Sequence, residues 1–207
     1  IVQSITRGVS DYDAVAGRVA AVPGVTSVTP IVEGQVMVST PDQSFGALVR
    51  GLRPKDLQKL PAVYASLTPQ ALNGFADGNS VIMGARLADR LGLRVGSNVT
   101  LIAPKGAVTP FGTTPRVKTY RVNGFFRVGM SEYDQTFIFM PLKEAQLFFG
   151  LEGVAGGIEV MVTDPDQVAQ HRAAIAAAAG PDARLLDWQQ MNSSLFGALM
   201  VERNVMF

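Results

Sequence analysis

Few side chains in this sequence could catalyse a reaction, and the first to consider is the single histidine, His171. An imidazole that acts as a general base or a metal ligand needs polar partners, whereas His171 stands among alanines on a predicted helix. We interpret it as a surface or half-buried helix residue. A single histidine also excludes the H-E-x-x-H zinc motif, and the absence of cysteine excludes disulfides and thiolate metal sites.

Paired carboxylates are the other groups that could bind a metal ion. Asp11 and Asp13 are two residues apart, as are Asp164 and Asp166, but the rest of a calcium-binding loop is missing at both places. Each pair stands at the start of a predicted helix, where a carboxylate can cap the free amides. We therefore favour capping over metal binding for both pairs.

Motifs for nucleotide binding and nucleophilic catalysis are missing as well. No lysine follows a glycine, as a phosphate-binding P-loop requires, and G-x-S-x-G does not occur. The glycine-rich segment 153–157 has no strand-to-helix context for a dinucleotide, and Glu132 and Asp134 are interpreted as residues of a solvated turn. The sequence therefore predicts a protein that is not an enzyme and that holds neither a metal nor a cofactor.

The composition is that of a folded domain with no charge bias. Hydrophobic residues make up 47% of the 207 residues and charged residues 17%, and the net charge of +1 argues against nucleic acid as a partner. No segment has the roughly 18 consecutive apolar residues of a membrane span. The chain begins at Ile1 and ends on an apolar stretch, 195–207. Two interpretations stay open: a piece of a longer membrane protein, or a chain whose last helix packs on its own core.

The segment from Lys105 to Pro115 is the most distinctive part of the chain. It joins two predicted strands, 98–103 and 118–126, and it is far longer than a minimal hairpin turn. Two prolines stiffen it, and two glycines allow tight bends. A stiff connection of this length predicts a loop with a function of its own.

An aromatic residue, Phe111, stands at the centre of this loop with Val108 nearby. An exposed apolar side chain on a preorganised loop suits a binding hot spot, because little entropy is lost when it docks. Alternatively, Phe111 folds back onto its own hairpin, as most large apolar side chains are covered. The residues alone leave both interpretations open.

Three basic residues, Arg116, Lys118 and Arg121, follow the loop directly. Because successive side chains of a strand alternate between its faces, we expect Arg116 and Lys118 to share one face. They could offer a cationic patch to an acidic partner. An ordinary solvated strand face explains the same pattern equally well.

The predicted elements around this loop fall into two groups. Both ends of the chain have a β-α-β pattern, and the middle is rich in strands, which suggests a discontinuous domain with a second domain inserted into it. The terminal elements are a strand at 1–6, a helix with an apolar stripe at 12–22, a strand at 25–32, and then a strand at 158–163, a helix at 166–179 and a strand at 183–186. In the middle we expect strands at 35–40, 45–51, 80–83 and 137–140 and helices at 85–91 and 142–149.

Several segments together resemble one family, the lipoprotein-releasing (LolC/LolE) permeases of bacterial ABC transporters. The order and spacing of these segments carry the resemblance over nearly the whole chain: 22–25 (Val-Pro-Gly-Val), 30–37, 84–96, 141–148 and 187–206. The third of them, Gly-Ala-Arg-Leu-Ala-Asp-Arg-Leu-Gly-Leu-Arg-Val-Gly, also resembles the wider MacB-like permease family.

The resemblance implies an α+β fold, the MacB-like periplasmic core domain. Residues 1–40 and 155–190 would form a porter-type β-α-β lobe built from both chain ends. Residues 41–154 would form an inserted strand-rich lobe with a long protruding hairpin, the hook, at 104–116. Residues 188–207 would form a helix that leads into the second membrane span.

In the family, the hook engages the periplasmic lipoprotein carrier LolA. The segment 109–115 resembles that hook, which favours an exposed Phe111 at its tip. In the family, a neighbouring surface called the pad, which is partly basic, assists the hook in carrier binding. Lys118 matches a basic position of that pad. Val117 stands where the family has a polar pad residue, and the third pad position, near Val99, is not basic here. The expected hook residues are Val108, Thr109, Pro110, Phe111, Gly112, Thr113, Thr114 and Pro115. The expected pad residues are Arg116, Lys118 and Arg121.

The function implied is that of a periplasmic domain of a Gram-negative inner-membrane permease, which receives the carrier and helps to pass outer-membrane lipoproteins to it. ATP hydrolysis would occur in a separate LolD-type ATPase, and a LolE-type subunit or a second copy would complete the complex. The alternatives are a MacB-like or FtsX-like permease domain, which the Thr-Pro-Phe-Gly loop and the segment around Trp188 disfavour, and a stand-alone protein that binds a small ligand.

Overall fold

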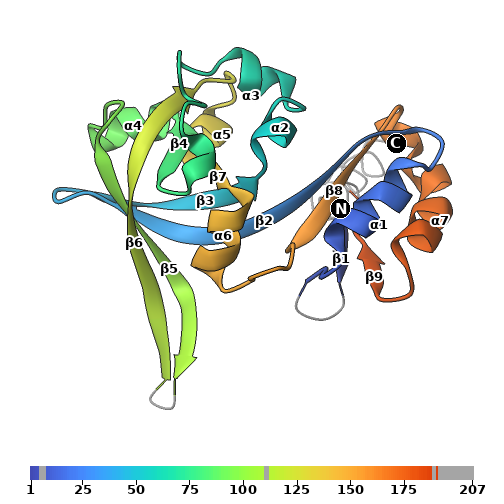
Figure 1. The fold of residues 1–207 in the computed structure, drawn as a ribbon. Coiled ribbons are helices and arrows are strands. Elements are labelled where there is room, and N and C mark those ends of the chain that lie inside the picture. The colour runs from blue at the N-terminus through green and yellow to red at the C-terminus, as the bar shows by residue number, and fades with distance from the viewer. Residues whose placement is uncertain (5–7, 110–111, 188–189, 191–207) are drawn as a thin grey trace, which may run out of the picture. The chain divides into compact units, whose positions relative to one another are not determined.

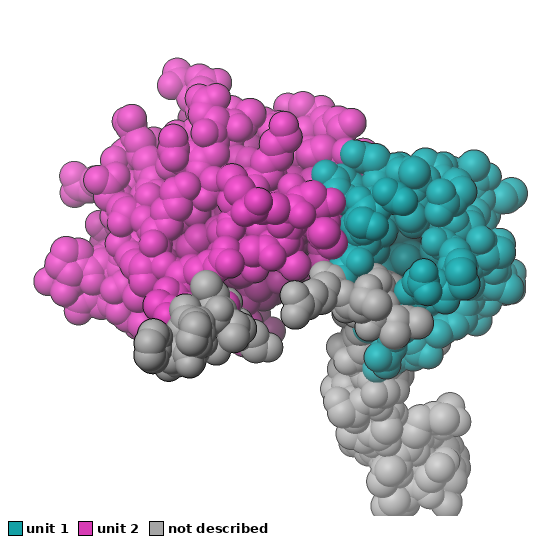
Figure 2. Space-filling model, turned by 60° about the horizontal axis from the view of Figure 1, so that its bottom comes forward, with its two compact units in different colours: residues 1–28, 157–207 teal, residues 29–156 magenta. Residues whose placement is uncertain are grey.

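The computed structural model describes residues 1–4, 8–109, 112–187 and 190. The chain divides into two compact units, coloured separately in Figure 2. Unit 1 comprises Ile1–Val28 and Gly157–Phe207, and unit 2 comprises Thr29–Gly156. The sequence placed the first boundary at residue 40, next to the turn at 41–42. The structure places it inside strand β2, because that strand runs on from one unit into the other.

Unit 1 is a small sheet with two helices, built from both ends of the chain. Its described elements are β1 (Val2–Ser4), α1 (Tyr12–Ala20), the first residues of β2 (Val25–Ser39), β8 (Gly157–Val162), η2 (Pro165–Gln167), α7 (Val168–Ala179) and β9 (Ala183–Leu185). The strands follow the order β2–β8–β1–β9. This is a split β-α-β arrangement, with unit 2 inserted between β2 and β8.

The helices of unit 1 follow the predicted apolar spacing. Val15 and Val19 are the buried residues of α1, and Ile175 and Ala179 are those of α7, four residues apart in each case because one helix face meets the core. They pack with Val2, Val28 and Ile158 in one core cluster.

The acidic pairs and the histidine of unit 1 lie at helix positions, but not all of them act as expected. The Asp164 side chain accepts a hydrogen bond from the Asp166 amide at 3.0 Å, so it caps the turn before α7. Asp11 occupies the N-cap position of α1 without a side-chain cap hydrogen bond. His171 is half-buried, and its ring lies against Gly24 in the turn before β2.

Unit 2 is a ring of strands with short helices around it (Figure 1). Strand β2 pairs with β3 (Ser44–Leu52), which pairs with β7 (Phe137–Pro141), then β4 (Ser80–Gly84), β6 (Gly112–Phe126) and β5 (Asn98–Thr109). Strand β5 pairs again with β2, which closes the ring. The helices are α2 (Pro54–Leu57), α3 (Pro61–Ala65), η1 (Phe75–Asp77), α4 (Ala85–Leu91), α5 (Ser131–Thr136) and α6 (Leu142–Phe149).

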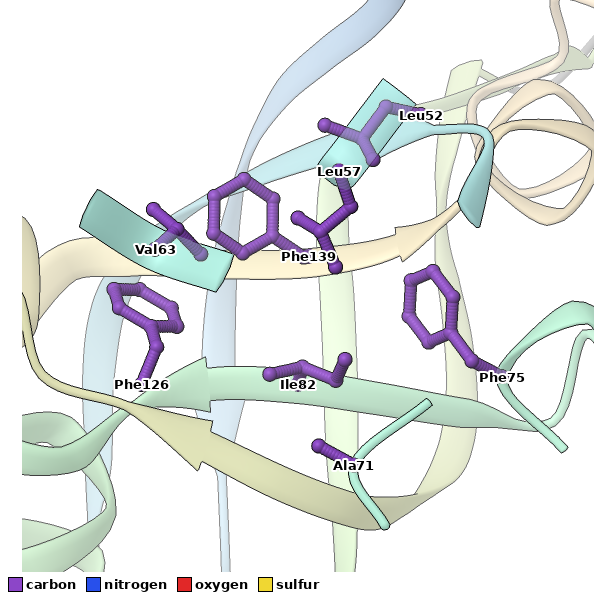
Figure 3. Packing of buried hydrophobic residues seen from close by; sticks show 8 residues of the cluster. All are labelled: Leu52, Leu57, Val63, Ala71, Phe75, Ile82, Phe126 and Phe139. Atoms are coloured by element: carbon purple, nitrogen blue, oxygen red, sulfur yellow. The ribbon is translucent and has the colours of Figure 1, made fainter. Parts of the chain in front are cut away.

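A core of aliphatic and aromatic side chains fills the helical side of unit 2. Figure 3 shows eight of its residues pointing toward one another from strands, helices and loops: Leu52, Leu57, Val63, Ala71, Phe75, Ile82, Phe126 and Phe139. The rings of Phe126 and Phe139 are tilted, with centroids 5.1 Å apart. Burial of these side chains removes apolar surface from water, which is the main force that holds the ring to its helices.

Two local predictions were wrong. Strand β2 is continuous where two strands were expected, and Gly34 in its interior leaves room for the ring of Phe149. Asp134 is not in a solvated turn. It lies on helix α5 and is fully buried. Its carboxylate can leave water because it accepts hydrogen bonds from the amides of Val128 at 2.9 Å and Gly129 at 3.1 Å.

Within the described residues, no helix has both the length and the apolar character needed to cross a membrane.

Candidate partner-binding hairpin

The predicted hook is a long hairpin formed by β5 and β6. Its ladder runs from Asn98 opposite Arg121 to Thr109 opposite Gly112, so only two residues connect the strands. Strand β5 pairs with β2 only through residues 100–102, and β6 pairs with β4 only from Arg121 onward. Among the described strands, the outer part of the hairpin therefore pairs only with itself. It runs on beyond the ring (Figure 1). At about 3.3 Å per residue, the six steps from residue 103 to residue 109 cover about 20 Å.

A bulge divides the hairpin into a root and an outer part. The register shifts between Ala103, which faces Arg116, and Ala107, which faces Thr114. Gly106 lies in the bulge, where a side chain would collide with the carbonyl oxygen of Thr114. The segment 105–115, expected as a loop, is thus mostly strand, because the bulge lets the ladder continue past the glycine.

The expected hook residues all belong to the outer part of this hairpin or to its tip. The structure places Val108, Thr109, Gly112, Thr113, Thr114 and Pro115 on the two strands. Thr114 and Pro115 are exposed. Pro110 and Phe111 lie outside the described residues, so the role of Phe111 stays a prediction.

Two of the expected pad residues, Arg116 and Lys118, lie on one face of β6, and that face meets helix α6. The Arg116 guanidinium donates to the carbonyl oxygen of Leu147 at 2.8 Å, and Lys118 Nζ lies 2.7 Å from Glu144 Oε1. Both basic groups therefore bind α6, 26 to 31 residues away in the sequence. The Lys118 side chain nevertheless stays 43% exposed, so the part of these two residues in a pad stays a prediction.

Glu144 is the residue that organises this face, and sequence reasoning missed it. It is 6% exposed, and its Oε1 accepts hydrogen bonds from Lys118 and, at 2.6 Å, from the hydroxyl of buried Tyr120. Burial of the phenol, together with this hydrogen bond, raises the pKa of Tyr120 above its ordinary value. The only signal in the sequence was an acidic residue on a helix that is rich in apolar residues.

Arg121 lies on the opposite face of β6 from Arg116 and Lys118. It is three positions further along the strand than Lys118, and its guanidinium lies beside Gly96 in the turn before β5. The structure thus brings two of the three expected pad residues together and leaves the third apart.

The described residues contain no group of three or more histidine and acidic side chains that could bind a metal ion. An apolar cavity of about 40 Å³ in unit 1, lined by residues that include Val160, Val168 and Ile175, is far smaller than the roughly 300 Å³ of an ordinary ligand site. Two wider hollows of unit 1, of about 400 and 690 Å³, are open to solvent, and neither gathers the convergent polar groups of a built site. The hairpin is the feature that calls for a binding partner.

Comparison with known proteins places this fold in a family. The profile of the MacB-like periplasmic core domain family matches residues 2–178, so the chain belongs to that family. The periplasmic region of MacB from Actinobacillus actinomycetemcomitans has a TM-score of 0.57 at 11% identity, over 94% of this chain and 90% of that one. The extracellular domain of the noncanonic ABC-type transporter YknZ from Gram-positive bacteria has a TM-score of 0.54 at 13% identity, over 90% of this chain and 100% of that one. These likenesses confirm the predicted fold.

Closer relatives are similar to this chain in sequence. It is 28% identical over 190 residues to the lipoprotein-releasing system transmembrane protein LolC of Neisseria meningitidis serogroup B, and 26% identical over 185 residues to LolC of Xylella fastidiosa. Each match covers 89% of this chain, which spans less than half of either relative, 45% and 44%. Family and relatives together identify a LolC-like periplasmic domain of an ABC transporter permease, which confirms the resemblance seen in the sequence.

Proposed function

We propose that this domain docks a periplasmic lipoprotein carrier of the LolA type and helps to pass outer-membrane lipoproteins to it. The observation that carries the proposal is the β5–β6 hairpin. Residues 103–109 and 112–116 leave the ring as a self-paired ladder, held at its root by helix α6. A stiff projection that is anchored at one end suits docking, because its conformation is fixed before the partner arrives.

The rest of the transporter enters the proposal through the relatives. Their name, lipoprotein-releasing system, supports lipoproteins as the cargo of the whole protein. We place this domain on a Gram-negative inner-membrane permease that works with a LolD-type ATPase and with a LolE-type subunit or a second copy of itself. ATP would be hydrolysed on the ATPase, so this domain would transmit motion and bind partners without catalysing a reaction.

The test is binding between the 207-residue chain and the purified LolA-type carrier of the same organism, measured by calorimetry for the wild type and for Phe111→Glu. We expect micromolar or tighter binding that Phe111→Glu abolishes, since removal of a hot-spot residue typically costs at least about 2 kcal/mol. Tyr64→Glu is the matched control, because Tyr64 is an aromatic residue that is 44% exposed on α3, away from the hairpin.

The possible outcomes separate the proposal from its rivals. Binding that Phe111→Glu removes and Tyr64→Glu leaves intact supports carrier docking through the hook. Binding that neither substitution affects moves the contact away from the tip. A folded wild type that does not bind the carrier rules the proposal out and leaves a LolE-like or MacB-like role.

A further inference from the structure

The tripeptide Asn-Gly-Phe occurs twice in the sequence, at 73–75 and at 123–125. Both copies belong to unit 2, but the structure gives them opposite surroundings. The first copy lies in the turns between α3 and β4, and the second lies within β6. A reaction that depends only on the local sequence should therefore occur at both copies, and any difference between them must come from the fold.

The first copy is open to solvent. Asn73 and Gly74 are both exposed, and Gly74 has the left-handed conformation at φ 68°. In the part of the chain that the structure describes, the Gly74 amide has no hydrogen-bond acceptor and the Asn73 side chain has no hydrogen-bond partner. The next residue, Phe75, is fully buried in the core of unit 2 (Figure 3). The turn is therefore held at its end while its Asn-Gly bond stays in water.

The second copy is enclosed. Gly124 is buried in β6, where that strand pairs with β4, and a side chain at this position would collide with Ala71 and Thr68. The side-chain amide of Asn123 donates to the carbonyl oxygen of Ala71 at 3.1 Å and to that of Asn73. The second asparagine is thus bound to the turn that contains the first.

An Asn-Gly bond can convert the asparagine by an intramolecular reaction. The deprotonated backbone nitrogen of the glycine attacks the side-chain Cγ, and the new N–Cγ bond closes a five-membered succinimide. The Cγ–Nδ2 bond breaks and the nitrogen leaves as ammonia with the proton that the backbone amide lost. Water then opens the ring at either carbonyl group and leaves aspartate or isoaspartate. Attack is intramolecular, and glycine has no Cβ atom to hinder it.

We propose that Asn73 is a site of spontaneous deamidation in this protein and that the fold protects Asn123. At Asn73 the peptide group has to rotate within an exposed turn, which is closed by the hydrogen bond from the Phe75 amide to the Leu72 carbonyl oxygen at 3.2 Å. At Asn123 the side chain has to leave both of its acceptors, and β6 has to separate from β4. Opening of a core strand is much rarer than opening of a surface turn.

Conversion of Asn73 would loosen the segment that covers the core of unit 2. The new carboxylate would lie in the same turn as Asp77, whose Oδ2 is 3.1 Å from the position that a Cβ atom of Gly74 would take, and like charges repel. In isoaspartate the main chain is also one carbon longer. The carbonyl group of residue 73 would then lose its place against Asn123, or Phe75 would shift in the core.

The primary test compares the two asparagines in one sample. The 207-residue chain is incubated at neutral and at mildly alkaline pH, digested at intervals, and the modified fraction of each peptide is measured by mass spectrometry. We expect deamidation at Asn73 to be at least about tenfold faster than at Asn123, because the turn opens more often than the strand. The chain unfolded in urea is the control, in which the identical tripeptides should react at similar rates.

Each outcome decides for or against the proposal. Equal rates in the folded chain, or a faster reaction at Asn123, would overturn it. It would also fail if neither asparagine reacts in the folded chain over a period in which both react in urea, since the turn would then protect Asn73 as well as the strand protects Asn123. None of these results depends on carrier binding.

A pair of variants tests the consequence for stability. Asn73→Asp places the product's charge in the turn, whereas Asn73→Gln keeps an amide and removes the five-membered ring closure. We expect Asn73→Asp to unfold at a lower urea concentration than Asn73→Gln, and we expect Asn73→Gln to abolish the modification of this peptide. Equal unfolding midpoints would show that the new charge does not loosen the turn. Ammonia loss from this peptide at an unchanged rate in Asn73→Gln would place the reaction at another residue and overturn the assignment of Asn73.

Discussion

The ammonium group of Lys118 on strand β6 lies 2.7 Å from the carboxylate of Glu144 on helix α6. The two residues are 26 positions apart, so their pairing ties the root of the hairpin to a helix that follows a different strand. Tyr120 adds a second hydrogen bond to the same oxygen and packs edge-on against Phe148 at 5.8 Å. The direction in which the hairpin leaves the ring is therefore set by contacts with α6.

Replacement of the carboxylate at this junction should destabilise unit 2. Glu144→Gln keeps an acceptor for Tyr120 and removes the charge that Lys118 faces, so we expect the free energy of unfolding to fall by about 1–2 kcal/mol. The value is modest because Lys118 is 43% exposed and water screens the pair. Urea denaturation measures it, with exposed Glu152→Gln as the matched control. Equal stability of the two variants would show that the pair contributes nothing.

The raised pKa of Tyr120 predicts a loss of stability in alkaline solution. In the unfolded chain the phenol loses its proton near its ordinary pKa of 10.0, whereas the folded state keeps it to higher pH. Above pH 10 the folded state holds more protons than the unfolded state, so the free energy of unfolding falls as the pH rises. Below pH 10 this contribution is fully present.

Comparison with Tyr120→Phe isolates this contribution, because phenylalanine does not titrate. At pH 7 we expect the variant to be less stable by about 1–2 kcal/mol, since Glu144 loses a donor. Between pH 10 and 11.5 the gap between wild type and variant should narrow. Unfolding curves at several pH values measure it, and a gap that stays constant would mean that Tyr120 titrates normally.

Asp134 should be essential for the loop that it closes. Asp134→Ala leaves a cavity at a fully buried site and removes the acceptor of the Val128 and Gly129 amides, so we expect a loss of about 2–4 kcal/mol in the free energy of unfolding. Glu132→Ala is the control on the same helix, because Glu132 is exposed, and it should stay within about 0.5 kcal/mol of the wild type. Thermal denaturation compares the three proteins, and similar losses for both variants would contradict the structural role of Asp134.

Much of the fold could be predicted because its signals are local. The segment from Ser80 to Gly92 contains a run of apolar residues, then helical spacing, then a terminating glycine. The structure has β4 at Ser80–Gly84 and α4 at Ala85–Leu91, with Gly92 in the left-handed conformation at φ 65°. Each boundary depends on residues within one turn of it.

The features that were missed depend on residues that are distant in the sequence. Alternation along β6 predicted that Arg116 and Lys118 share a face, but nothing near them indicated that α6 covers that face. The burial of Asp134 could not be predicted for the same reason, because it depends on a loop that brings two amides to the carboxylate. The exposed apolar neighbours Met37, Ile102 and Val117 could not be foreseen either, since they come together only when three strands pair in register.

The close packing of helix α5 against the end of β4 predicts a strict requirement for glycine at position 84. A methyl group added to Gly84 would collide with the main-chain carbonyl group of Asp134, which cannot rotate away as a side chain could. We expect Gly84→Ala to lower the free energy of unfolding by about 1–3 kcal/mol, as overpacking of a rigid core does.

Gly46→Ala is the matched control, because Gly46 is also a strand glycine and has no neighbour within 4 Å of an added methyl group. It should be neutral or slightly stabilising, since alanine loses less backbone entropy than glycine on folding. Chemical denaturation of both variants decides the matter: equal effects would mean that α5 moves to accept the methyl group, and that its contact with β4 is not rigid.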